Sequence, residues 1–77
     1  MEFVDEDTLA SWLTREIQKH HGCDRCEIVK VYKRQDAEDS ERNWRVGIFV
    51  SHNPDQEACR KNLNHVQDSA AEQFKLA

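Results

Sequence analysis

Residues that break or loosen a backbone are scarce in this chain, which has two glycines and one proline among 77 residues. Neither Gly22 nor Gly47 belongs to a glycine-rich loop of the kind that cradles phosphates, because such a loop needs several glycines close together. The chain also lacks internal repeats, low-complexity tracts and linkers. These absences exclude a P-loop nucleotide site and indicate one continuous folded domain spanning residues 1–77.

Long apolar runs are absent as well. No stretch approaches the roughly 20 apolar residues that a membrane-spanning helix needs. The N-terminal run Met1–Asp7 is acidic, whereas a signal peptide begins with basic residues. The cysteines number three, and an odd count fits a reducing compartment better than a disulfide framework. We therefore expect a cytoplasmic protein that does not associate with membranes.

The charge balance is acidic, with a formal net charge of −4 at pH 7. This charge argues against nonspecific attraction to nucleic acids or lipid headgroups, since the whole molecule would gain no counterion-release energy there. Apolar residues make up 38% of the chain, but they are grouped with clear periods, which indicates a folded domain rather than a disordered one. A core of this size only just outweighs chain entropy, so a partner or a dimer is expected.

The first segment predicts a helix over residues 6–20. Its apolar side chains recur at spacings of three and four and share one helical face: Leu9, Trp12, Leu13 and Ile17. Asp5 or Asp7 is expected to accept the free amides at the helix start, and Gly22 to supply the left-handed stop.

Two runs rich in β-branched residues, 26–34 and 44–51, predict strands. The polar segment between them predicts an antiparallel hairpin with a solvated, acidic tip. One pairing places Val29 opposite Ile48 and Val31 opposite Val46. Trp44 and Val50 would then share their side of the hairpin. We expect that side to be the core face.

The last segment predicts a second helix over residues 54–76. Asn53 is a good N-cap residue, Pro54 suits the first turn, and Gln56 stands at the capping-box position. An apolar stripe follows along one face: Cys59, Leu63, Val66, Ala70 and Phe74. The expected fold is a two-layer α+β domain of order α-β-β-α, in which both helices pack against the hairpin.

The other face of the hairpin mixes rings and cations, namely Lys30, Tyr32, Arg34, Arg45 and Phe49, together with Ile28. One interpretation is a solvated outer face whose basic side chains lie along the rings. Another is a surface that binds a protein partner. A third is a single-stranded nucleic-acid site, in which bases stack on Tyr32 and Phe49 while the cations meet phosphates. The chain has no RNP-like motif and no GXXG loop, which weighs against the third.

A two-stranded sheet also leaves unpaired backbone groups along both edges. Edge pairing of two hairpins would build a four-stranded sheet in a symmetric homodimer. The cations Lys30, Lys33 and Arg45 weigh against this assembly, because charged side chains discourage edge pairing.

The turn after the first helix carries a ligand-like group, His20, Cys23 and Cys26. Two thiolates and an imidazole supply three of the four ligands of a tetrahedral zinc site. The fourth would be His52, Cys59, His65, water or a second subunit. The alternative is structural, with Cys26 at the core edge, Cys23 in a turn and Cys59 as a small buried hydrophobe. A redox role has less support, since this pair follows a helix C-terminus, where the dipole disfavours a thiolate.

No nucleophile with a base and an orienting group, no pair of carboxylates on a rigid wall and no cofactor motif is found in the sequence. We therefore expect no enzyme and no bound cofactor. The function predicted is a small protein-interaction module that acts through the outer sheet face or the hairpin edge. The alternatives are a single-stranded nucleic-acid-binding domain and a structural zinc module.

Overall fold

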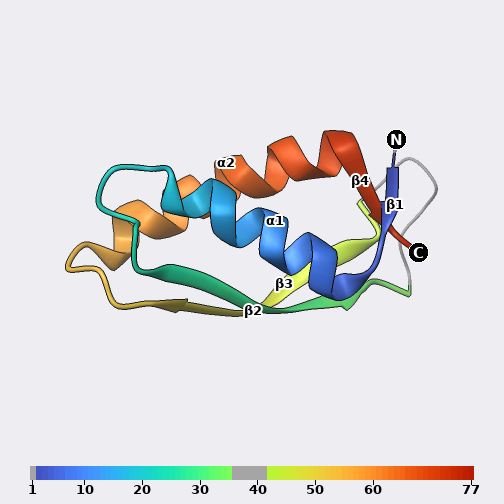
Figure 1. Ribbon diagram of the computed structural model, residues 1–77, viewed down its shortest axis with the longest axis horizontal. Coiled ribbons are helices and arrows are strands. Elements are labelled where there is room, and N and C mark those ends of the chain that lie inside the picture. Colours follow the sequence, from blue (N-terminus) through green and yellow to red (C-terminus); the bar gives the residue numbers. More distant parts are fainter. Residues whose placement is uncertain (1, 36–41) are drawn as a thin grey trace.

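The computed structural model of the protein describes residues 2–35 and 42–77. Its elements are β1 (Glu2–Val4), α1 (Glu6–Gln18), β2 (Cys26–Lys33), β3 (Trp44–Ser51), α2 (Gln56–Gln73) and β4 (Phe74–Leu76). Both helices lie on one side of the β2–β3 hairpin (Figure 1), which confirms the predicted α+β fold with its α-β-β-α order. The predicted acidic hairpin tip falls on residues 36–41, outside the described residues.

Helix α1 begins where the sequence predicts. The Asp5 carboxylate accepts a hydrogen bond from the Thr8 amide at 2.7 Å, so Asp5 is the N-cap. This bond to Thr8 holds the pKa of Asp5 below its ordinary value. The helix buries Leu9, Leu13 and Ile17 completely. It ends two residues earlier than predicted, and Gly22 takes a positive φ of 80° in the turn that follows.

Helix α2 is capped by Asp55, whose carboxylate accepts from the Ala58 amide at 3.0 Å. The prediction that Asn53 is the cap is therefore wrong by two residues, and Gln56 is the first helical residue rather than a capping-box partner. The predicted apolar stripe is buried at Cys59, Leu63, Val66 and Ala70. The helix ends at Gln73, three residues before the predicted end.

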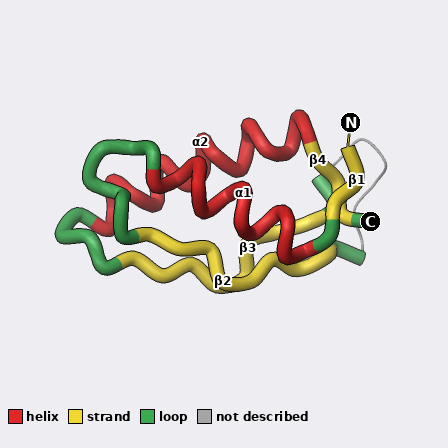
Figure 2. Tube along the Cα trace, viewed as in Figure 1, coloured by secondary structure: helices red, strands yellow, loops and turns green. Residues whose placement is uncertain are grey.

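Two short strands that the sequence did not predict join the ends of the described chain. Strands β1 and β4 pair in parallel, with Glu2 opposite Phe74 and Val4 opposite Leu76. The Ala77 amide extends the pairing with a 2.9 Å hydrogen bond to the Val4 carbonyl. Figure 2 shows this second, smaller sheet at one end of the helical layer. Val4 and Leu76 are buried, so the pair closes that end of the core.

The hairpin register agrees with the prediction at Val31, which lies opposite Val46. It differs at the centre, where Lys30 rather than Val29 faces Ile48. The pairing shifts on both sides of this point, so each strand carries one extra residue, Val29 on β2 and Gly47 on β3. Irregularities of this kind bend a strand and turn its side chains toward a different face.

This shift overturns part of the predicted core face. Val31 and Trp44 are buried as predicted, whereas Val29, Ile48 and Val50 are 48%, 43% and 36% exposed. The prediction is also wrong for Ile28 and Phe49, which the sequence pattern assigned to the outer face. Ile28 is 3% exposed, and Phe49 is half-buried and packs against the core. A strictly alternating pattern fails here because both strands change faces at their extra residue.

Trp44 connects the hairpin to the closing pair of strands. Its side chain is fully buried, and its indole Nε1 donates a hydrogen bond to the Phe74 carbonyl at 3.3 Å. The neighbouring Asn43 side chain bonds both backbone groups of Leu76, donating to its carbonyl at 3.0 Å and accepting from its amide at 2.9 Å. These contacts fix β4 against the start of β3. Within residues 2–35 and 42–77, no helix has the length and apolar character needed to cross a membrane.

Candidate functional sites

Both helices lie on one side of the hairpin (Figure 1), and we define its outer face by the exposed or partly exposed residues Val29, Lys30, Tyr32, Arg45, Ile48 and Val50. Val29 also borders a groove between β2 and α1. Its composition changes along the strands. The half toward the start of β2 is mostly apolar, with Val29, Ile48 and Val50, although the exposed Glu27 is paired directly opposite Val50. The half toward the end of β2 is a ring flanked by cations, with Tyr32 between Lys30 and Arg45.

Tyr32 lies between two cations, and the position of its ring depends on Gly47. A Cβ atom at position 47 would overlap the Tyr32 ring, so the absence of a side chain there lets the ring lie across β3. The Lys30 ammonium lies 5.8 Å from the ring centroid and the Arg45 guanidinium 5.9 Å from it. Both separations are within the range of cation–π attraction. Three of the five predicted binding residues therefore meet in one cluster.

The other two predicted binding residues lie apart from this cluster. Phe49 packs against the core and lines a groove between β3 and α2 together with Leu63. Arg34 donates from Nη1 to the Arg42 carbonyl at 3.2 Å, beyond the end of β2. The surface predicted to carry two rings and three cations thus presents one ring and two cations.

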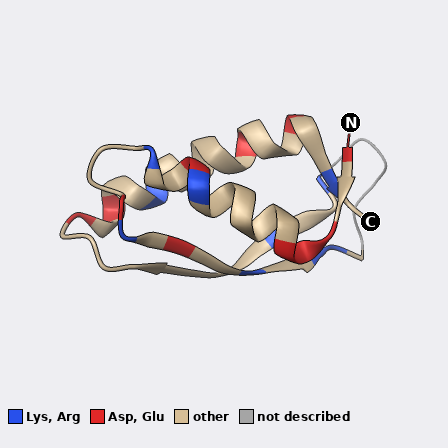
Figure 3. Cartoon of the chain, viewed as in Figure 1, with Lys and Arg blue, Asp and Glu red and all other residues tan. Residues whose placement is uncertain are grey.

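Lys30 also forms an ion pair with helix α1. Its ammonium lies 3.1 Å from the Glu6 carboxylate at the start of α1, where Figure 3 shows acidic residues beside the basic part of β2. The hydrogen bond to Glu6, and then the charge of Glu6, raise the pKa of Lys30 above its ordinary value of 10.5. One cation of the outer face is therefore already partly neutralised by the protein itself.

Replacing Glu6 by Gln is expected to lower the pKa of Lys30 toward 10.5, as followed by NMR of the Lys30 side-chain carbon and protons next to Nζ. Because the folded-state pKa is raised, the pair stabilises the fold fully below the unfolded pKa, and this contribution is lost as pH rises through the folded pKa. Asp7→Asn is the matched control, since Asp7 contributes less than Glu6. Equal shifts in both variants would contradict the assignment of Glu6 as the main partner.

The outer edge of β2 is occupied at its first half by side chains of α1. The Thr14 hydroxyl accepts from the Ile28 amide at 3.0 Å and donates to the Ile28 carbonyl at 3.4 Å. The side-chain amide of Gln18 donates to the Cys26 carbonyl at 3.0 Å. These are the backbone groups that a further strand would need, so α1 covers this part of the edge.

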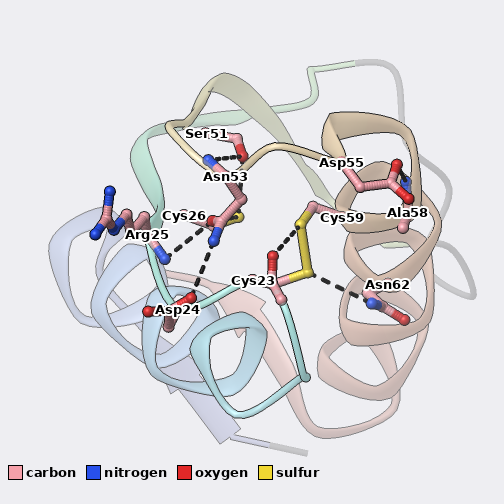
Figure 4. Close-up of a disulfide and its surroundings, with 11 residues drawn as sticks. Cys23, Asp24, Arg25, Cys26, Ser51, Asn53, Asp55, Ala58, Cys59 and Asn62 are labelled. Carbon is pink, nitrogen blue, oxygen red and sulfur yellow. Dashed lines mark hydrogen bonds between the residues drawn. A yellow bond between two sulfur atoms is a disulfide. The ribbon is translucent and has the colours of Figure 1, made fainter.

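A second candidate site is the cysteine cluster formed by Cys23, Cys26 and Cys59. A disulfide joins Cys23, in the turn after α1, to Cys59, in the first turn of α2, with the Cα atoms 5.6 Å apart (Figure 4). Cys26 at the start of β2 is outside this bond and buried. The three sulfur atoms lie within 4.8 Å of one another. The disulfide therefore ties α2 to the loop between α1 and β2, with a third thiol beside it.

Asn53 organises the loops around the cluster and is itself buried. Its Oδ1 accepts from the Arg25 amide at 3.0 Å and from the Cys26 thiol at 3.3 Å, and its Nδ2 donates to the Asp24 carboxylate at 3.0 Å (Figure 4). Instead of capping α2, this residue joins the turn before β2 to the turn after β3. A buried amide with these partners fixes both turns in place.

The predicted metal ligands are divided between two places. Cys23 and Cys26 lie together in the cluster, joined by Cys59, which the sequence offered among several candidates for a fourth ligand. His20 instead lines the groove between α1 and α2, with Glu16 and His65. Within the described part of the chain, metal-ligating side chains converge in one group, the three cysteines. No local signal marks Cys59, because its partners are far away in the sequence.

Comparison with known proteins identifies no relative: no protein-family model matches the chain, and no curated protein and no solved structure matches it. The chemistry of both candidate sites therefore has to follow from their own residues.

Proposed function

We propose that the protein is a small, non-catalytic interaction module that binds a protein partner with the outer face of its hairpin. The observation that supports this is the distribution of exposed apolar side chains. Of the five large hydrophobic residues exposed in the described part of the chain, four belong to the hairpin: Val29, Tyr32, Ile48 and Val50. Apolar side chains gathered on one face, rather than scattered singly, are typical of a protein-binding surface.

The chemistry of the face indicates what the partner presents. The apolar half would pack against an apolar centre, and Tyr32 would supply a large anchoring ring of the kind enriched at binding hot spots. Arg45, beside that ring, would meet a carboxylate at the rim. The proposed partner is therefore a protein with an apolar patch bordered by acidic residues.

The face is a better candidate than the edge of β2. Pairing of two hairpins along that edge would have to displace Thr14 and Gln18 from the Ile28 and Cys26 backbone. Each displaced bond is partly buried, and its loss costs at most roughly 1–3 kcal/mol if its group is left unpaired. A homodimer stays within the proposal as a second copy packing its own outer face against the first.

The nucleic-acid alternative has less support than the protein-binding proposal. Stacking two bases was expected to use Tyr32 and Phe49, but Phe49 packs against the core. Lys30 would also have to exchange its Glu6 partner for a phosphate. A single ring and a net charge of −4 make a weak platform for a polyanion.

The proposal predicts position-dependent crosslinking in cells. A photoreactive amino acid in place of Val50 is expected to give defined crosslinked species, while the same replacement of exposed Glu72 on α2 serves as the matched control. Adding Ile48→Lys should remove the Val50 crosslinks, because a charge is placed in the apolar half. Its effect on stability is expected to stay within about 0.5 kcal/mol, since Ile48 is exposed.

Mass spectrometry of the crosslinked species distinguishes a second copy from another protein. Identical patterns from positions 50 and 72, or Val50 crosslinks that persist with Ile48→Lys, would contradict the proposal. Crosslinking to nucleic acid instead of protein at position 50 would replace it with the nucleic-acid alternative.

A further inference from the structure

We propose that Cys23, Cys26 and Cys59 bind one zinc ion when the Cys23–Cys59 disulfide is reduced. This site is independent of the outer face. It differs from the set indicated by the sequence because Cys59 replaces His20.

The spacing of the sulfur atoms fits a tetrahedral ion. Zinc–sulfur bonds of about 2.3 Å at tetrahedral angles place ligand sulfurs about 3.8 Å apart. The three sulfurs lie within 4.8 Å of one another, so small side-chain rotations suffice once Cys23 and Cys59 are no longer bonded. All three residues are at most 1% exposed, so an ion bound by them would be shielded from solvent.

Polar groups lie close to all three sulfurs, including the Gly22 carbonyl oxygen 3.3 Å from the Cys59 sulfur. Asn53 Oδ1 lies 3.3 Å and Ser51 Oγ 3.4 Å from the Cys26 sulfur, so the fourth position would be filled by a neutral oxygen rather than by a fourth thiolate or an imidazole. The Asn62 side-chain amide lies 3.5 Å from the Cys23 sulfur and donates to it (Figure 4). Donors of this kind stabilise a metal-bound thiolate and orient it.

The conversion between the two forms is balanced in atoms and electrons. A dithiol reductant gives two electrons and two protons to the Cys23–Cys59 bond, which becomes two thiols while the reductant becomes a disulfide. Zinc then displaces the protons of the three thiols, which pass to solvent. The covalent bond and the metal ion would hold the same segments together, the turn after α1, the start of β2 and the first turn of α2.

The helix dipoles act differently on Cys59 and on the other two cysteines. A helix C-terminus disfavours a thiolate, and this argument applied to Cys23 and Cys26, which follow α1. Cys59 lies four residues after the Asp55 cap, in the first turn of α2, where the helix dipole favours a negative sulfur. One of the three ligands therefore lies where a thiolate is stabilised.

The test uses alkylation of the reduced, wild-type protein with and without zinc, in a phosphine reductant and without oxygen. Trypsin cleaves after Arg25, between Cys23 and Cys26, and after Arg45 and Arg60, so each cysteine falls on its own peptide. Zinc at 100 times its Kd is expected to slow alkylation of all three cysteines about 100-fold, because binding stabilises the closed form. Native mass spectrometry should show one zinc per chain in the reduced protein and none in the oxidised protein.

Two variants separate the possible ligand sets. Cys26→Ser removes a proposed ligand but keeps the disulfide, so its folding is checked in the oxidised form, and its reduced form is expected to lose the zinc complex. His20→Ala is the matched control and should retain it. Equal alkylation with and without zinc, protection of fewer than three cysteines, zinc binding by the oxidised protein, or loss of zinc in His20→Ala would each overturn the proposal.

Discussion

Reduction of the Cys23–Cys59 disulfide is expected to lower the free energy of unfolding by about 4 kcal/mol when metal is excluded by a chelator. The bond joins residues 36 positions apart, and the loop-closure entropy removed from the unfolded chain corresponds to about that value. A domain of this length is expected to have a total stability of only about 4–12 kcal/mol. The reduced protein should therefore retain a free energy of unfolding of only about 0–8 kcal/mol.

Urea denaturation of the oxidised and reduced protein measures this difference. Cys26→Ser is expected to show the same drop on reduction, because Cys26 is outside the bond. The double variant Cys23→Ser/Cys59→Ser should not respond to the reductant at all. Equal midpoints for the oxidised and reduced wild-type protein would show that the disulfide does not limit the unfolded state. Zinc in place of the chelator should recover part of the loss if the proposed metal site exists.

Trp44→Ala is expected to destabilise the protein by about 3–5 kcal/mol. Trp44 is fully buried between the hairpin and the helical layer, so truncation leaves a large cavity. It also removes the donor to the Phe74 carbonyl, which holds β4 against β3. Trp12→Ala is the matched control, because Trp12 is only half-buried, and its loss should have a smaller effect.

Trp44→Phe separates the two causes. It keeps an aromatic ring but lacks the indole N–H, so part of the cost should come from the unpaired Phe74 carbonyl, about 1–3 kcal/mol. The measurement is the urea midpoint, together with amide hydrogen exchange at Leu76, which reports β4. A Trp44→Ala variant no less stable than Trp12→Ala would contradict the central position assigned to Trp44.

Local signals in the sequence predict most of the fold. Helix periodicity identifies the buried residues of α1 and most of those of α2, and β-branched runs locate β2 and β3 closely. The short strands β1 and β4 could not be predicted, because three residues are too few to show a periodic pattern. Their pairing also depends on contact between distant parts of the chain. Phe74 fits the helical stripe equally well, and tertiary pairing decides that it begins a strand instead.

The faces of the hairpin could not be assigned because both strands are apolar on two sides. Ile28 and Val29 are neighbours on β2, and Ile48, Phe49 and Val50 are consecutive on β3, so alternation does not select one face. The extra residues Val29 and Gly47 change the orientation at mid-strand, and no local pattern announces such a shift. This is why the candidate binding face turned out to be more apolar than the sequence indicated.

The sequence predicted only part of the cysteine cluster, because the rest depends on tertiary packing. Cys23 and Cys26 are close in sequence and were grouped with His20, which is equally close. The spatial partner is Cys59, brought in by the packing of α2 beside α1 and fixed by the turns around Asn53. Ligand sets that span distant segments are set by tertiary packing, which spacing rules do not contain.

The parallel pairing of β1 with β4 determines how the described chain would respond to force. A pull applied at Glu2 and Leu76 draws the two strands past each other along their length, because the strands run in the same direction and the pull acts on opposite ends of the pair. Their hydrogen bonds, including that from Ala77 to Val4, are then loaded together in shear rather than opened one by one. The β1–β4 pair would therefore protect the hairpin and helices from tension until its hydrogen bonds break together.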